Sequence, residues 1–176
     1  MTRAAGFVRG ASAFVAPTAT VRGDVRLGAW SSIWFRAVVR AHAGSVDVGE
    51  RSNVQDGAVL VGIGQATVIG ADVTIGHRAM LIGCRVGDHC LIGNASTVLS
   101  GAVLPPWTFV TVGSCVGPEL RIPEGSLVTG RPARVLRPIA DRERALMASA
   151  PAHYVQLLQA YRGSGTRPLV GTGSST

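Results

Sequence analysis

The chain has 176 residues, of which 47% are hydrophobic, and a formal net charge of +7 at pH 7. This length and apolar content predict one domain with a substantial core. No run of about 18 apolar residues is present to span a membrane, and Arg9 and Gly10 interrupt the apolar stretch that a signal peptide would need, so we expect a cytoplasmic protein without membrane contact. The basic residues are all arginine and lie scattered without interleaved aromatic residues, which argues against a nucleic-acid partner.

An aliphatic residue recurs every six positions along most of the chain. The period starts at Val15, is interrupted at residues 40–47 and again at 61–68, and then holds to Val128. It contracts once to a five-residue step, before Val86. A six-residue period fits neither a helix nor an ordinary strand, and it predicts a solenoid.

The period predicts a parallel β-helix whose coils have three flat sides and roughly 18 residues each. The aliphatic residues would point to the coil axis and stack on their equivalents about 4.8 Å away. A glycine follows the aliphatic at Gly70, Gly76, Gly87 and Gly93. We expect these glycines to supply either a positive φ or a close approach of two backbones.

Three segments are expected in chain order. Residues 1–135 form the solenoid, because Pro132 and Pro138 would stop further winding. Residues 136–162 form a helical segment that packs on the solenoid, and residues 163–176, rich in glycine and serine, form a flexible tail.

The helical segment has a proline in its middle. Ser149 and Pro151 are typical of a cap followed by proline at a first helical position, so we expect a helix that is kinked or broken at Pro151. Beyond it, Tyr154, Leu158 and Tyr161 would share one apolar face.

Cysteine spacing excludes two kinds of site. Cys84, Cys90 and Cys115 are odd in number and form no CxxC pair, which argues against a disulfide framework and a thiolate zinc site. We expect reduced thiols in the core.

Several motifs give the chain a resemblance to the γ-class carbonic anhydrases, a branch of the hexapeptide-repeat proteins. They are GDV at residues 23–25, SIW at 32–34, VVR at 38–40, NVQDG at 53–57 and VTIGHRAMLIGC at 73–84. The resemblance covers about residues 10–162. It implies a mainly β fold, a left-handed parallel β-helix, that assembles into a homotrimer with active sites between subunits.

In that family three histidines from two subunits hold zinc, and the resemblance places them at Val61, His77 and Ile82 of this chain. Catalytic zinc needs three protein ligands, and valine and isoleucine have no lone pair to offer. The other histidines, His42, His89 and His153, do not stand at the lost positions. We therefore expect no metal, no other cofactor and no carbonic anhydrase activity.

The main functional hypothesis is a metal-independent enzyme that acts on a small organic molecule in the intersubunit cleft. Hydration, dehydration, isomerisation or cyclisation would each need proton transfer, for which an imidazole is suited. His77 would be the acid or base, oriented by Gln55 and Asp56. The expected substrate-binding residues are Arg40, His42, Val61 and Ile82.

Two alternatives remain open on the sequence. Loss of two zinc ligands is equally consistent with a non-catalytic trimer subunit. A coenzyme A-dependent acyltransferase is the third hypothesis, because related hexapeptide proteins bind coenzyme A between subunits and use a single histidine base. For Arg40, the resemblance implies an ion pair across the trimer, but the carboxylate of the family's RGD-like turn is replaced here by His42.

Overall fold

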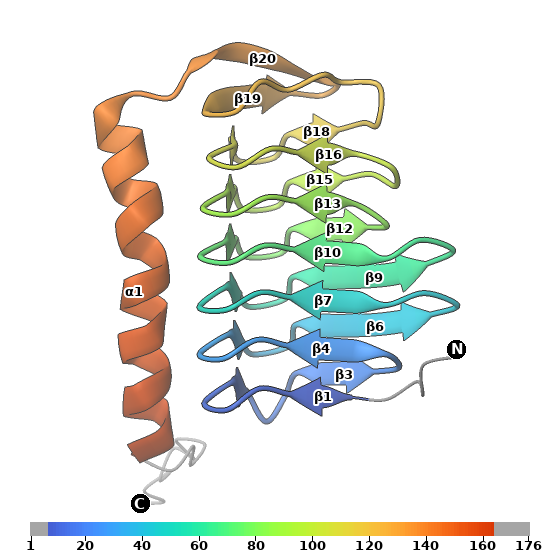
Figure 1. The fold of residues 1–176 in the computed structure, drawn as a ribbon, viewed down its shortest axis with the longest axis vertical. Coiled ribbons are helices and arrows are strands. Elements are labelled where there is room, and N and C mark those ends of the chain that lie inside the picture. Colours follow the sequence, from blue (N-terminus) through green and yellow to red (C-terminus); the bar gives the residue numbers. More distant parts are fainter. Residues whose placement is uncertain (1–6, 164–176) are drawn as a thin grey trace, which may run out of the picture.

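The computed structural model describes residues 7–163 and has three parallel sheets wound into a left-handed β-helix, with one long helix alongside (Figure 1). The mainly β prediction is therefore confirmed. Residues 1–6 and the expected tail beyond Gly163 lie outside the described part.

Each turn of the solenoid contributes one strand to each of the sheets, which we name A, B and C. Sheet A consists of β1 (Val8–Arg9), β4 (Val25–Leu27), β7 (Val46–Val48), β10 (Thr67–Ile69), β13 (Arg85–Val86) and β16 (Val103–Leu104). Sheet B consists of β2 (Phe14–Val15), β5 (Ser32–Ile33), β8 (Asn53–Val54), β11 (Thr74–Ile75), β14 (Leu91–Ile92), β17 (Phe109–Val110), β19 (Ser126–Gly130) and β20 (Ala133–Pro138). Sheet C consists of β3 (Thr20–Arg22), β6 (Val38–His42), β9 (Val59–Ile63), β12 (Met80–Ile82), β15 (Thr97–Val98) and β18 (Cys115–Val116).

The strand register reproduces the sequence period and its interruptions. The Arg36 amide bonds to Thr18, 18 residues away, whereas Val73 bonds to Ser52 over 21 residues and Ala71 to Asp88 over 17. The two longer coils follow from the two interruptions, where β6 and β9 extend beyond the other strands (Figure 1). The five-residue step before Val86 accounts for the shorter coil.

The expected aliphatic column forms the core. Ile75, Leu81 and Ile92 are completely buried inside the coils, and they stack on equivalents from the turns before and after. The glycines allow two backbones to approach closely and do not supply a positive φ. A Cβ on Gly76, for example, would lie 2.7 Å from the Ile92 carbonyl oxygen. The left-handed conformation falls two residues later, at Arg78, with φ 58°.

The solenoid ends where β19 and β20 pair antiparallel, and the chain then returns along sheet B as α1 (Asp141–Gly163). This corrects two expectations. Residues 133–138 form a strand, so the helix begins at Asp141, and it runs through Pro151 without a break. Ser149 lies inside the helix, where its hydroxyl donates to the Leu146 carbonyl (3.1 Å), rather than at a cap.

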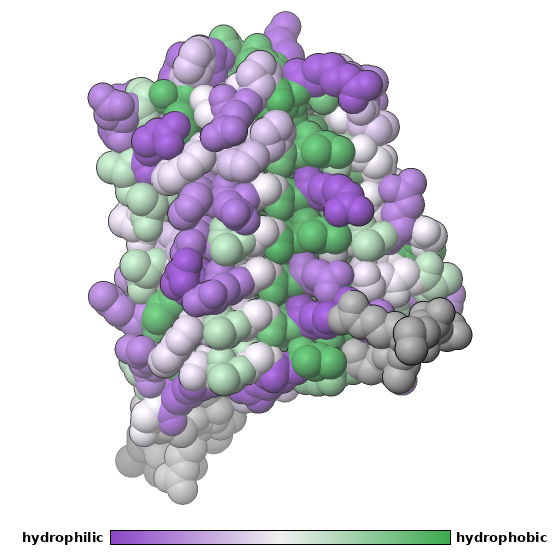
Figure 2. All heavy atoms as spheres, in the orientation of Figure 1, coloured by the Kyte–Doolittle hydropathy of each residue, from purple (hydrophilic) through white to green (hydrophobic). Residues whose placement is uncertain are grey.

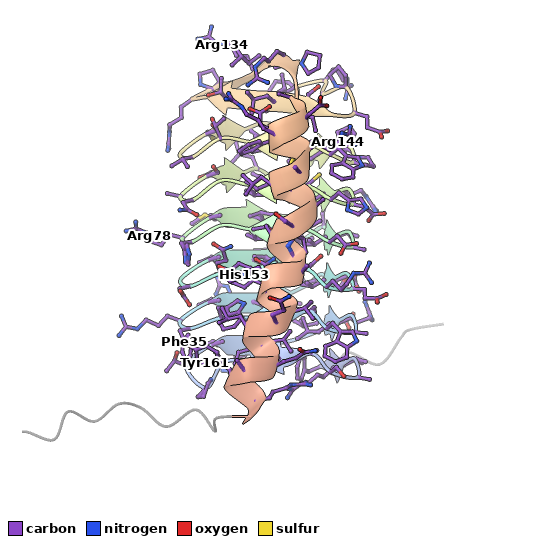
Figure 3. The ribbon with its side chains drawn as sticks, turned by 90° about the vertical axis from the view of Figure 1, so that its left-hand side faces the viewer. Phe35, Arg78, Arg134, Arg144, His153 and Tyr161 are labelled. Atoms are coloured by element: carbon purple, nitrogen blue, oxygen red, sulfur yellow. The ribbon has the colours of Figure 1, made fainter. Side chains whose placement is uncertain are left out.

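Packing on both sides of Pro151 explains why the helix continues through a residue that lacks an N–H. Met147 and Leu158, before and after it, are buried, as is Pro151 itself. Near the helix C-terminus, Leu158 joins a cluster with Phe14 and Trp34 of the first coils. The Tyr161 ring completes this cluster, 5.4 Å from Trp34 and 5.6 Å from Phe35 (Figure 3). Tertiary packing thus outweighs the local cost of the proline.

Glu143 caps the other end of the helix. Its carboxylate accepts a hydrogen bond from the Ala140 amide (2.6 Å) and pairs with both terminal nitrogens of Arg137 (2.7 and 2.8 Å). The hydrogen bonds to the guanidinium are the main reason that the pKa of Glu143 falls from 4.5 to about 2.

This pKa shift predicts a pH-dependent helix start. Because the carboxyl pKa is lower in the folded protein, the stabilisation is fully present above about pH 4.5 and is lost as the pH falls towards 2. Thermal unfolding followed by circular dichroism between pH 5 and pH 2.5 should show a smaller loss of stability for Glu143→Gln than for the unchanged protein. The control, Glu124→Gln, removes an exposed carboxylate and should behave like the unchanged protein; equal pH dependence of all three would contradict the assignment.

The cysteines follow the prediction in part. Within the described residues all three are free thiols, and Cys84 and Cys90 are buried while Cys115 is partly exposed. Burial raises the pKa of both Cys84 and Cys90 to about 12, so these two thiols are poor nucleophiles.

The outer surface is mixed in character. Figure 2 shows hydrophilic and apolar residues side by side on that face. Several arginines near the end of the solenoid have local partners: Arg137 pairs with Glu143, and the Arg144 guanidinium lies 4.3 Å from the centre of the Trp107 ring. Within residues 7–163, the helix α1 is not apolar enough to cross a membrane.

Candidate functional site

His77 lies at the corner between sheets B and C, directly after β11. Its Nδ1 is 3.3 Å from Oδ2 of Asp56, which occupies the same corner one coil earlier. The other Asp56 oxygen accepts a hydrogen bond from the Phe35 amide (3.0 Å), and the His77 amide donates to Oδ1 of Asn94 (3.0 Å). Hydrogen bonds to the coil before and the coil after therefore fix the Asp56 carboxylate and the backbone of His77.

This geometry suits proton transfer. A carboxylate beside Nδ1 favours the proton on that nitrogen, which leaves Nε2 with a lone pair that can accept one. The imidazole remains accessible, with 42% of its side-chain surface exposed. Beside it is a hollow of about 320 Å³, lined by His77, Asp56, Phe35, Arg36, Gly57 and Arg78.

Gln55 lies on the other side of the same corner, between sheet B and α1. It is almost fully buried, and its Nε2 donates to Asn53 Oδ1 (3.2 Å), whose own amide donates to Thr74 Oγ1 (3.0 Å). Gln55 lines a separate, mainly apolar hollow of about 290 Å³ that reaches Phe109 and Ala150. The side chain therefore belongs to a row of polar groups that links neighbouring coils and does not enter the hollow beside His77.

The other four candidates lie on sheet C. Arg40, Val61 and Ile82 occupy one register position on the adjacent strands β6, β9 and β12, and His42 ends β6. Val61 is only 7% exposed, whereas Arg40 and His42 are exposed. Arg40 and His42 line a hollow of about 510 Å³.

The single chain does not bring these residues together. His77 and Asp56 lie at the corner where strands of sheet C begin, and Val61, Ile82 and His42 lie towards the ends of those strands. The sequence missed one residue near the first group, Tyr154, which α1 brings to this corner. Burial and, to a lesser degree, the charge of Asp56 raise its pKa. The sequence placed Tyr154 on the apolar face of the helix, but its position near Asp56 depends on how the helix docks and has no local signal.

The fold and these residues define a hexapeptide-repeat solenoid with a carboxylate–histidine pair at one corner. Comparison with known proteins is more specific. No family model matches the chain. It is 36% identical over 152 residues to a probable carbonic anhydrase from Methanocaldococcus jannaschii, covering 84% of this chain and 96% of that protein. It is 34% identical over 161 residues to protein YrdA from Escherichia coli, covering 86% of this chain and 88% of YrdA.

The chain therefore belongs to the γ-carbonic anhydrase-like family of hexapeptide-repeat proteins. γ-Carbonic anhydrase 1 from Arabidopsis thaliana mitochondria is 41% identical over 164 residues; the match covers 89% of this chain but 60% of the plant protein. A hexapeptide transferase family protein from Anaplasma phagocytophilum has the same fold, with a TM-score of 0.84, 34% identity and coverage of 88% of this chain and 92% of that one. A Bacillus cereus protein described as a candidate acetyltransferase is also similar, with a TM-score of 0.87 and 35% identity, over 90% of this chain and 92% of that chain.

The residues that the resemblance places at the zinc positions, Val61, His77 and Ile82, include one imidazole and two hydrocarbon side chains, a set that does not fit a zinc ion. Val61 and Ile82 are direct neighbours across β9 and β12, and neither has a side-chain atom that could coordinate a metal. His77 is the one imidazole of the set, and its Nδ1 faces Asp56. Across residues 7–163 of one subunit, the side chains of histidine, cysteine, aspartate and glutamate form no group of three that could hold an ion.

Proposed function

We propose that this protein is a metal-independent enzyme that performs acid–base chemistry on a small organic molecule in an intersubunit cleft of a homotrimer. The observation that carries the proposal is the His77–Asp56 pair, 3.3 Å apart, in a chain whose positions 61 and 82 carry hydrocarbon side chains. On this proposal a proton-transfer group is kept and the zinc ligands are lost. On this proposal the protein is not a functional carbonic anhydrase.

In the proposed mechanism Nε2 of His77 takes or gives a proton, and Asp56 holds the imidazole and stabilises its charged form. Hydration, dehydration, isomerisation and cyclisation are the reaction classes that such a pair can support. Val61 and Ile82 would contact the apolar part of the substrate, and Arg40 and His42 would bind a developing oxyanion. Gln55 would not contact the substrate; it would support the corner through its hydrogen bond to Asn53.

The trimer is part of the proposal because, within one subunit, His77 and Asp56 lie apart from Val61 and Ile82. Support comes from the outward face of sheet C, where Val38, Val59 and Met80 share a register position and Met80 is 41% exposed. An apolar strip of this kind is stabilised when another subunit covers it. A second copy that presents its His77 corner to this face would bring the two groups of residues together. We place the assembled protein in the cytoplasm.

The test uses proton exchange, because it needs no knowledge of the natural substrate. A panel of small ketones and enoates in D2O, with chelator present, is followed by NMR for deuterium incorporation. We expect His77→Gln to lose about 100-fold or more of any exchange that the unchanged protein catalyses, while remaining folded and trimeric. His153→Gln, on the exposed face of α1, is the matched control and should keep full activity.

Equal exchange by His77→Gln would contradict the assignment. A folded trimer that catalyses no exchange across the panel would favour the alternative, a non-catalytic trimer subunit. Binding of coenzyme A thioesters would favour an acyltransferase, the activity named for the Bacillus cereus structural relative.

A further inference from the structure

Two arginines lie directly opposite each other on sheet C. Arg22 on β3 and Arg40 on β6 are register partners on neighbouring strands, which are about 4.8 Å apart. The residues before them, Val21 and Val39, are likewise register partners, and Val39 is fully buried. Because successive side chains of a strand point to opposite faces, both arginine side chains project from the outer face of the sheet.

Neither guanidinium has a carboxylate partner in residues 7–163. The arginine ion pairs of the described chain involve Arg26, Arg51 and Arg137, and the carboxylates nearest in sequence, Asp24 and Asp47, are both held by Arg26. Like charges placed directly opposite across strands are destabilising, and arginine does not lose its charge at physiological pH. An arrangement of this kind is stabilised when an anion lies between the two groups.

The surroundings form a hollow for such an anion. Arg22, Arg40, Thr20 and His42 line the space of about 510 Å³ above the sheet. Guanidinium groups bind planar carboxylates through paired hydrogen bonds, and the Thr20 hydroxyl is a further possible donor.

The same row of the sheet becomes apolar on the next strands. In register with Arg22 and Arg40 come Val61 and then Ile82, each one strand further along. Three strand spacings, roughly 14 Å, thus lead from a doubly cationic end to a hydrocarbon end. A ligand that matches this row has an anionic group at one end and an apolar body.

We infer that Arg22 and Arg40 form a binding site for a small organic carboxylate whose apolar part lies along Val61 and Ile82. The inference rests on the proposed function, because it names the substrate class of the same cleft. It assigns a role to Arg22, which the sequence did not single out. It also gives Arg40 a ligand in place of the ion pair that the resemblance implies.

Isothermal titration calorimetry on the full-length assembled protein at low salt tests this inference. The probes are 3-phenylpropionate, its uncharged amide, acetate and phenyl phosphate. We expect 3-phenylpropionate to bind, and the amide and acetate to bind at least tenfold more weakly. Arg22→Gln and Arg40→Gln should each weaken binding by about tenfold to a hundredfold, the usual range for loss of a charge-assisted hydrogen bond. Arg85→Gln on sheet A removes an equally exposed arginine and should leave binding unchanged.

Equal affinity for the acid and the amide would overturn the inference, as would unchanged binding in both arginine variants. Tighter binding of phenyl phosphate than of 3-phenylpropionate would overturn the choice of a carboxylate. If Arg40→Gln separates the subunits while Arg22→Gln keeps both the assembly and full affinity, the arginines serve the interface and the inference fails. Calorimetry records no turnover, so 3-phenylpropionate bound by His77→Gln with unchanged affinity would support this inference even where proton exchange fails.

Discussion

Introducing histidine at positions 61 and 82 together is expected to create a zinc site in a protein that we propose to be metal-independent. The two Cα atoms are register partners on adjacent strands, so two imidazoles would stand side by side at a spacing of about 4.8 Å. With His77 of a second subunit they would supply the three nitrogen ligands that a catalytic zinc requires, with one position left open. Elemental mass spectrometry of Val61→His/Ile82→His should approach one zinc per subunit, and carbon dioxide hydration should become measurable.

Two controls keep this result interpretable. Val61→His alone supplies two ligands and should bind zinc far more weakly. Adding His77→Ala to the double variant should remove the metal again. Failure of the correctly folded double variant to take up zinc would mean that the subunits do not bring His77 to positions 61 and 82, and this would remove the proposed intersubunit cleft.

Leu81→Ala is expected to lower the free energy of unfolding by about 3–5 kcal/mol, the upper part of the range for large-to-small core changes. Leu81 is completely buried and stacked between Leu60 and Val98 of the neighbouring coils. Both neighbours belong to continuous parallel ladders, so the walls of the cavity have little freedom to collapse. Urea unfolding at one fixed protein concentration measures the change, because the proposed assembly would make stability depend on concentration.

The control for this variant is Val103→Ala on sheet A, where the side chain is 54% exposed and a change within about 0.5 kcal/mol is expected. A loss below 1 kcal/mol for Leu81→Ala would show that the core does not depend on close stacking of successive coils.

The sequence predicted the solenoid well because each coil repeats the same physical constraint. Ile75, Leu81 and Ile92 must all fill one narrow interior, so their spacing directly records the length of each side. The sequence marked the interruptions at residues 40–47 and 61–68, and the structure shows that they lengthen β6, β9 and the coils to which these strands belong. The role of the glycines was open between two explanations, and the close approach of Gly76 to Ile92 decides it.

The C-terminal segment was harder to predict because its structure depends on contacts distant in sequence. Local sequence preferences predicted a kink or break at Pro151 and a cap at Ser149. Burial of Met147, Pro151 and Leu158 against the solenoid instead holds the segment as one continuous helix. The real cap is Glu143, whose partner Arg137 lies on the preceding strand. Residues 133–138 pair back on β19, which a six-residue period could not indicate.

The candidate site was predictable as a set of residues but not as an assembled geometry. The motif around His77 identified the Asp56–His77 pair, and the structure adds its 3.3 Å separation. Gln55 was expected beside the histidine, yet its side chain is turned towards α1. Arg22 escaped notice because its significance lies in its register with Arg40, 18 residues later, which only strand pairing reveals.

The absence of a catalytic metal is the central claim, and the most direct measurement is the metal content of the purified, untagged protein after growth with added zinc. Elemental mass spectrometry should find far less than one zinc per subunit. Close to one zinc per subunit would contradict the claim; the ligands would then be sought among His42, His77 and His89, and carbonic anhydrase activity would have to be tested.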